Sequence, residues 1–130
     1  MGFEQILRKT VLVAEDDQSI ADLLLFWLEK ENYQTFRALD GHQALDLSLR
    51  HTPDLLIIDL QMPFMDGGTA AQEIRRHDSL REKPIVFMTA HGDKGIELFV
   101  NIEMLGDGPI EYITKPLDFV YLGELLRRLL

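Results

Sequence analysis

Polar and charged side chains stand where four apolar segments of this sequence end. Glu15 and Asp16 directly follow the segment TVLVA, and Asp59 ends the segment LLIID. Thr89 ends the segment IVFMT, and Lys115 follows the segment EYIT. A carboxylate this close to an apolar core costs free energy unless a cation compensates its charge, so Asp59 requires a partner from elsewhere in the chain.

The three carboxylates favour the chemistry of a divalent cation and a phosphoryl group. Two unit charges about 4 Å apart interact by roughly 4 kcal/mol at an effective dielectric constant near 20, so clustered acids repel one another strongly. Mg²⁺ relieves that repulsion, because it prefers oxygen ligands and commonly bridges a carboxylate and a phosphate. A carboxylate is also a nucleophile toward phosphorus, which makes Asp59 a candidate acceptor of a phosphoryl group.

Alternating strand and helix patterns predict how these side chains come together. Five strands are expected, at residues 10–14, 33–38, 55–59, 85–89 and 111–114. The first, third and fourth are aliphatic almost throughout, as in a parallel sheet covered on both faces. The pattern predicts a doubly wound α/β fold, and 130 residues fit one domain of five βα units. In such sheets ligands bind at the carboxyl ends of the strands, where the polar residues stand.

The helix-length segments differ in how clearly they show one apolar face. The first carries apolar residues at helical spacing, namely Ile20, Leu23, Leu24, Trp27 and Leu28. The last repeats this pattern with Leu122, Leu125, Leu126 and Leu129, and weaker helical patterns cover residues 43–50 and 69–77. Asp17 is expected to cap the first helix, and the pair Asp66 and Gly67 to form a turn.

Composition and charge exclude several classes of function. Thirteen Lys and Arg against twenty-two Asp and Glu leave a net charge of −9, which would repel nucleic-acid phosphates, so direct nucleic-acid binding is not expected. The chain has no cysteine, so disulfides and thiolate metal sites are excluded. No apolar run approaches the roughly 20 residues that span a bilayer, and the opening MGFEQILRKT lacks a signal-peptide core, so we expect a cytoplasmic protein without membrane insertion.

Four motifs, taken together and in order, resemble the CheY-like receiver domain of response regulators in two-component signal transduction. The motifs are VLVAEDD, LLIIDLQMPFMDG, VFMTA and YITKP, and the resemblance spans nearly the whole chain, as one receiver domain over residues 1–130. It implies a flavodoxin-like five-stranded parallel sheet of order 2-1-3-4-5 with helices on both faces. It also implies a cis peptide bond between Lys115 and Pro116.

The resemblance assigns a role to each polar residue at the strand ends. Asp59 matches the aspartate that accepts the phosphoryl group. Asp16 and Asp59 match direct ligands of Mg²⁺ (or Mn²⁺), with Glu15 acting through water and the backbone carbonyl of Gln61 as a further ligand. Lys115 matches the lysine that contacts the phosphate.

Further positions match residues that switch the domain or tune it. Thr89 matches the switch hydroxyl and Tyr112 the aromatic residue that changes rotamer. Gln61 and His91 each stand two positions after a site residue, where the resemblance implies control of dephosphorylation.

Simpler interpretations remain open for single residues. Glu15 and Asp16 suit the start of a helix, where acidic residues are favourable. Thr89 and Tyr112 suit a half-buried strand, and Lys115 suits a solvated position before a proline.

The leading hypothesis is a phosphorylation-dependent signalling switch. A sensor histidine kinase or phosphotransfer protein donates to Asp59, and the modified domain binds a downstream protein or itself. We expect the contact surface to consist of the segment from Ile96 to Leu105, Tyr112 and the last helix. The apolar residues between Ile96 and Leu105 lie on more than one helical face, which favours a surface that binds a partner. The domain supports its own phosphoryl transfer and slow autodephosphorylation rather than acting as an enzyme on other substrates.

Two alternatives from other classes stay open. A small aspartyl-phosphate phosphatase or phosphotransferase would resemble DxD, whereas position 61 is Gln. A phosphorylation-independent interaction module is the third interpretation, although the site residues are all present together.

Overall fold

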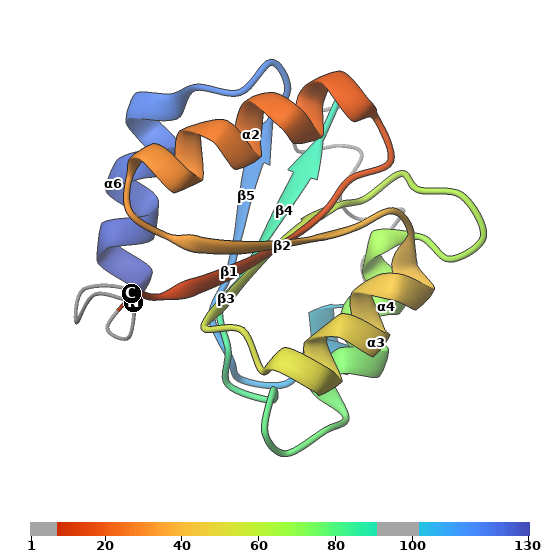
Figure 1. The fold of residues 1–130 in the computed structure, drawn as a ribbon. Helices are drawn as coiled ribbons and strands as arrows, with labels where there is room; N and C mark the ends of the chain where they lie inside the picture. The colour runs from red at the N-terminus through yellow and green to blue at the C-terminus, as the bar shows by residue number, and fades with distance from the viewer. Residues whose placement is uncertain (1–7, 91–101) are drawn as a thin grey trace.

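The computed structural model describes residues 8–90 and 102–130 of the chain, and these form a five-stranded parallel sheet with helices on both faces (Figure 1). The elements in chain order are β1 (Thr10–Ala14), α2 (Gln18–Lys30), β2 (Gln34–Ala38), α3 (Gly41–His51), β3 (Leu55–Asp59), α4 (Gly67–Arg75), β4 (Ile85–Thr89), the 3₁₀ helix η1 (Ile102–Leu105), β5 (Ile110–Thr114) and α6 (Phe119–Leu129). The strand order is β2-β1-β3-β4-β5, and every neighbouring pair is parallel. The predicted doubly wound topology is confirmed.

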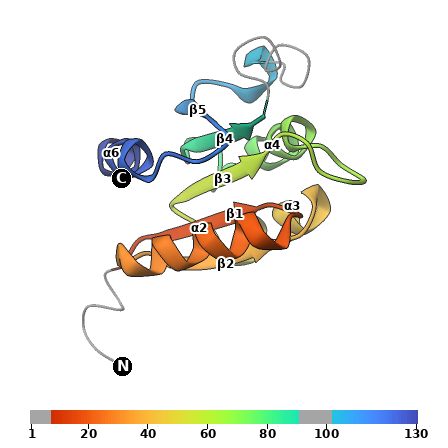
Figure 2. The same cartoon turned by 90° about the horizontal axis from the view of Figure 1, so that it is seen from above.

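Two apolar layers hold the helices to the sheet, with α2 and α6 on one face and α3 and α4 on the other (Figures 1 and 2). Alternate residues of β1 point into different layers. Val11 and Val13 join the cluster that contains residues of α2 and α6, whereas Leu12 and Ala14 join the cluster with residues of α3 and α4. All residues of β3 and β4 are buried, which explains their continuous aliphatic sequences.

Each of the four α-helices within residues 8–90 and 102–130 is directly preceded by an aspartate whose carboxylate accepts a hydrogen bond from a backbone N–H three residues later. The capping residues are Asp17, Asp40, Asp66 and Asp118. Such caps satisfy a backbone donor that the first turn leaves unpaired. The prediction for Asp17 is confirmed, whereas the turn predicted at Asp66 and Gly67 is the start of helix α4.

Element boundaries differ slightly from the sequence prediction. β2 begins at Gln34 instead of residue 33, because the N–H of Tyr33 donates to Leu28 at the end of α2. β5 begins one residue early, at Ile110, where the N–H of Ile85 already pairs with Pro109. The cis bond predicted between Lys115 and Pro116 is present.

The segment predicted as an apolar helix over residues 96–105 is described only at its end. Residues 96–101 lie outside the described residues, and η1 is a single 3₁₀ turn. Leu105 is fully buried in the core layer of α3 and α4, while Met104 is 51% exposed. In residues 8–90 and 102–130, no helix has both the length and the apolar character needed to cross a membrane.

Arg75, in the last turn of α4, is a buried cation that binds only backbone carbonyls among the hydrogen bonds described for it. Its guanidinium donates to Leu105 at 2.8 Å, Gly108 at 3.1 Å, Lys83 at 3.0 Å and Pro109 at 2.8 Å. Burial lowers the pKa of Arg75 from its ordinary value. One side chain thus joins α4, the turn before β4 and the loop before β5.

Replacement of Arg75 by Met is expected to destabilise the domain by about 2–4 kcal/mol, because buried carbonyl groups lose their donor. The matched control is Arg76→Met. The side chain of the neighbouring Arg76 is 64% exposed, and its ion pair with Glu73, at 3.7 Å, lies on the surface. That control should change the free energy of unfolding by less than about 0.5 kcal/mol. Urea denaturation measures both, and equal losses for the two variants would contradict a bridging role for Arg75.

Candidate functional site

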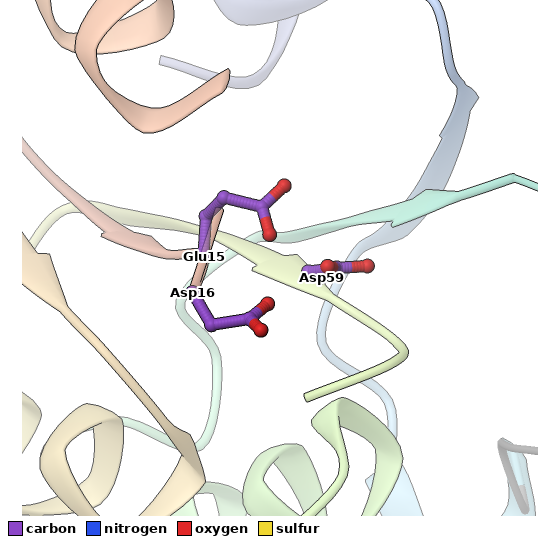
Figure 3. Close-up of side chains that lie close together, drawn as sticks. All are labelled: Glu15, Asp16 and Asp59. Carbon is purple, nitrogen blue, oxygen red and sulfur yellow. The ribbon is translucent and has the colours of Figure 1, made fainter. Parts of the chain in front are cut away.

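Three carboxylates converge at the carboxyl edge of the sheet (Figure 3). Glu15 and Asp16 directly follow β1, and Asp59 is the last residue of β3. Because β1 and β3 pair in parallel with Ala14 opposite Ile58, the residues that follow these two are brought level with each other. One carboxylate oxygen from each acid lies within 4.8 Å of the others; Glu15 and Asp59 are buried and Asp16 is exposed.

Lys115, directly after β5, supplies a positive charge between the two buried acids. Its Nζ donates to Glu15 Oε1 at 2.7 Å and to Asp59 Oδ2 at 3.1 Å. Burial by itself would lower the pKa of Lys115, but the hydrogen bond to Glu15 and the charge of Asp59 outweigh it and raise the pKa. The ammonium group therefore stays protonated across the physiological range.

One ammonium group does not compensate three carboxylates, and the consequence appears at Glu15. Burial, a side-chain hydrogen bond with Asp59 and the charge of Asp59 raise the pKa of Glu15 to about 7, against the opposing effect of Lys115. The site therefore carries excess negative charge, and all of its candidate donor atoms are carboxylate oxygens. One of these carboxylates, that of Asp16, is open to solvent. These features fit an oxygen-coordinated divalent cation such as Mg²⁺.

Backbone contacts orient the acids. The N–H of Gln61 donates to Asp59 Oδ1 at 3.2 Å, and the N–H of Asp17 donates to Glu15 Oε2 at 3.4 Å. Gly67 packs so closely behind the site that a Cβ there would lie 2.2 Å from the backbone oxygen of Asp59. A side chain at position 67 would displace β3 at its end, so the glycine is a requirement of the site rather than of a turn.

The other predicted site residues lie at different distances from this cluster. Thr89 is buried at the end of β4, and its carbonyl accepts the N–H of Lys115 at 2.9 Å, so it shares the same edge. Gln61 is exposed in the loop after β3. Tyr112 lies further back on β5, opposite Phe87 in register, and the two rings stack with centroids 5.7 Å apart. His91 lies outside the described residues.

Tyr112 is half-buried, and its hydroxyl has no hydrogen-bond partner within residues 8–90 and 102–130. Burial raises the pKa of this phenol. A buried hydroxyl that lacks a partner costs free energy, so the inward position of the Tyr112 ring is not fully satisfied.

Arg37 is a neighbour of the site that sequence reasoning did not identify. Its Nε and Nη2 donate to the backbone carbonyl of Glu15 at 3.4 and 3.3 Å. Arg37 lies on β2 opposite Val13 of β1, and Val13 stands two residues before Glu15. Arg37 therefore lies near the same carboxyl edge of the sheet as the acids. The signal in the sequence is a single charge inside a predicted strand, and only the β1–β2 register relates it to Glu15.

Glu15→Gln is expected to gain stability relative to the parent chain as the pH rises. Since the pKa of Glu15 is 4.5 when unfolded and about 7 when folded, its contribution to stability is complete below 4.5 and is lost as the pH passes about 7. Gln does not ionise, so in EDTA the difference between the variants should grow by up to about 3 kcal/mol between pH 5 and pH 8. Urea denaturation across this range measures it, with Glu124→Gln on the exposed face of α6 as the control; a constant difference would contradict the prediction.

Comparisons with known proteins agree with the fold. The structure superposes on the chemotaxis protein CheY4 of Vibrio cholerae with a TM-score of 0.84 at 24% identity, covering 95% of this chain and 99% of that one. A receiver domain of a sensor histidine kinase from Pseudomonas aeruginosa PAO1, whose active-site cleft coordinates a magnesium ion, gives 0.83 at 27% identity over 94% and 97% of the two chains. A response regulator receiver domain from Francisella gives 0.78 at 29% identity over 94% and 96%.

The family model of the response regulator receiver domain matches residues 11–127, which include β1 from its second residue, the other four strands in full and all three acids of the site. Since this match covers most of the chain and the strand order agrees with it, this chain belongs to the family of response regulator receiver domains.

Proposed function

We propose that this receiver domain is a switch that accepts a phosphoryl group on Asp59 from a sensor histidine kinase or a phosphotransfer protein. The observation that carries the proposal is the convergence of Asp59 with Glu15, Asp16 and Lys115 at one edge of the sheet. Asp59 is held at both carboxylate oxygens, at Oδ2 by Lys115 and at Oδ1 by the N–H of Gln61.

The transfer is a displacement at phosphorus. A carboxylate oxygen of Asp59 forms the new P–O bond while the P–N bond of the donor phosphohistidine breaks, and the leaving imidazole keeps the electron pair and takes up a proton. Lys115 neutralises charge on a phosphoryl oxygen, and the hydroxyl of Thr89 donates a hydrogen bond to another. Later attack of water on the acyl phosphate releases inorganic phosphate and returns Asp59 to its carboxylate, so the domain catalyses its own dephosphorylation.

The acids around Asp59 would hold Mg²⁺ or Mn²⁺. Asp16 and Asp59 would be direct ligands, with the backbone carbonyl of Gln61, and the buried Glu15 would act through water. When bound, the cation supplies charge neutralisation at the attacking carboxylate and at the phosphoryl oxygens. The magnesium ion in the active-site cleft of the related Pseudomonas aeruginosa domain supports this assignment.

Phosphorylation would change the surface through Thr89 and Tyr112. A phosphoryl group on Asp59 offers a new acceptor to the Thr89 hydroxyl, and movement of that side chain alters the space at the end of β4. The Tyr112 hydroxyl has no partner in the part of the chain that the structure describes, which favours a second rotamer. The output surface would include Tyr112, Met104 and α6, where Val120 is 75% exposed, for a downstream protein or a second copy of the chain.

Asp59→Asn should abolish phosphorylation, because an amide is not a nucleophile toward phosphorus. Incubation with acetyl phosphate and Mg²⁺, followed by intact-mass measurement, should yield one phosphoryl adduct on the parent chain and none on the variant. The matched control is Asp66→Asn, since asparagine also caps a helix and Asp66 caps α4. An adduct on Asp59→Asn, or loss of the adduct in the control alone, would sink the assignment.

We further propose that Gln61 and His91 tune the lifetime of the acyl phosphate, because each stands two positions after a residue at the phosphoryl site. The double variant Gln61→Ala with His91→Ala should change the half-life of phosphorylated protein by at least about threefold, a difference of roughly 0.7 kcal/mol in the barrier. Decay of the adduct after removal of acetyl phosphate measures this. An unchanged half-life would discard the proposal.

A further inference from the structure

Phe64 is an aromatic residue placed in water close to the phosphoryl acceptor. It stands five positions after Asp59 in the loop between β3 and α4. The residue is 89% exposed, the largest value among the exposed large apolar residues within 8–90 and 104–130. An aromatic ring in this position contributes almost no buried area to the fold.

The backbone at Phe64 is also unfavourable for a bulky residue. Its φ is +68°, in the left-handed region that glycine adopts freely and that β-carbons disfavour. The N–H of Met65 donates to the carbonyl of Pro63 at 2.8 Å, which closes a three-residue turn with Phe64 at its centre. Turns of this type with positive φ are rare and strained. Folding alone would therefore favour glycine at position 64.

The loop is anchored on both sides of Phe64, so the ring is held outward. Met65 packs against Gly41, where a Cβ would lie 2.6 Å from the Met65 carbonyl oxygen. On the other flank, the N–H of Gln61 donates to Asp59 Oδ1, and the N–H of Gly67 donates to Leu60 at 3.1 Å. Strained residues persist where the surroundings determine their conformation, and they cluster at functional sites.

We propose that Phe64 is an anchor for the protein that donates the phosphoryl group, inserting into an apolar recess beside the donor's phosphohistidine and helping to select that donor. This inference rests on the proposed function of Asp59. Aromatic side chains on rigid loops are effective interface anchors, because they bury a large area and lose little conformational entropy.

The position of Asp59 identifies the occupant. Asp59 is only 5% exposed, so a protein donor must bring its histidine down to the carboxyl edge of the sheet. The donor surface around that histidine then faces the loop that carries Phe64, because the N–H of Gln61 in this loop donates to Asp59 itself. The N–H of Gly67, the first residue of α4, donates to Leu60 directly after β3 and holds the other end of the loop close to the site. A small donor such as acetyl phosphate reaches Asp59 without covering this loop.

Comparison of transfer from a protein donor with transfer from a small donor separates a role of Phe64 in binding the donor protein from a role in the reaction at Asp59. The probe is the ³²P-labelled histidine phosphotransfer domain from the same genome that transfers fastest to the parent chain, compared with acetyl phosphate. Phe64→Gly removes the ring and relaxes the backbone, Phe64→Trp keeps an aromatic ring, and Leu49→Asn alters another exposed apolar residue, near the far end of α3.

Phe64→Gly should lower kcat/KM for the protein donor by at least about tenfold, mainly through a higher KM, with an unfolding midpoint no lower than that of the parent. Phe64→Trp should stay within about threefold of the parent and Leu49→Asn within about twofold, and acetyl phosphate should label all variants at the parental rate.

Parental transfer by Phe64→Gly would overturn the inference. An equal loss of transfer rate with both donors would overturn it as well, because Phe64 would then support Asp59 itself. A changed acyl-phosphate lifetime with unchanged transfer would also overturn it, because the ring would then shield the site from water. If neither donor labels the parent chain, the proposed function fails, and this inference fails with it.

Discussion

Glu15 and Asp59 are two buried acids that share one ammonium group, Lys115, and the rest of the domain is arranged around this incompletely neutralised cluster. Removal of charge from water is costly, and like charges at this spacing add to the cost, so the cluster is a weak source of stability. The two apolar layers that cover the sheet supply the stability instead. The two buried carboxylates share a single positive charge, and the apolar core holds them in place without depending on them for its own stability.

The geometry of the cluster depends on a frame that leaves little freedom near it. Gly67 packs directly on the carbonyl of Asp59, and aspartate caps fix where each helix leaves the sheet edge. At the other side of the domain, Arg75 ties α4 to the loops before β4 and β5. Because Lys115 directly follows β5, the position of that strand matters for the acids as well as for the core. A rigid frame suits phosphoryl transfer, which depends on positioning more than on covalent help from the protein.

The edge that carries the acids also carries two residues outside the acidic cluster, Phe64 and Arg37. Phe64 is strained and exposed, and Arg37 directs its guanidinium to the backbone of Glu15. The match to the receiver family shows the family of this chain and by itself assigns no role to either residue. The strained backbone of the exposed Phe64 breaks a local rule without a gain in packing, and such residues cluster at functional sites.

The sequence by itself determined the α/β class, the approximate strands and the identity of the polar residues at their ends. It could do so because buried parallel strands read as continuous aliphatic runs and because a charge at the end of such a run is conspicuous. Local pattern did not reveal that Asp66 and Gly67 start a helix, that Gly67 touches Asp59, or that Arg37 reaches Glu15. Those contacts join residues that are distant in the chain or depend on ångström-scale packing. Only the strand order and register, which tertiary packing decides, brought residues 15, 59 and 115 within the reach of one another.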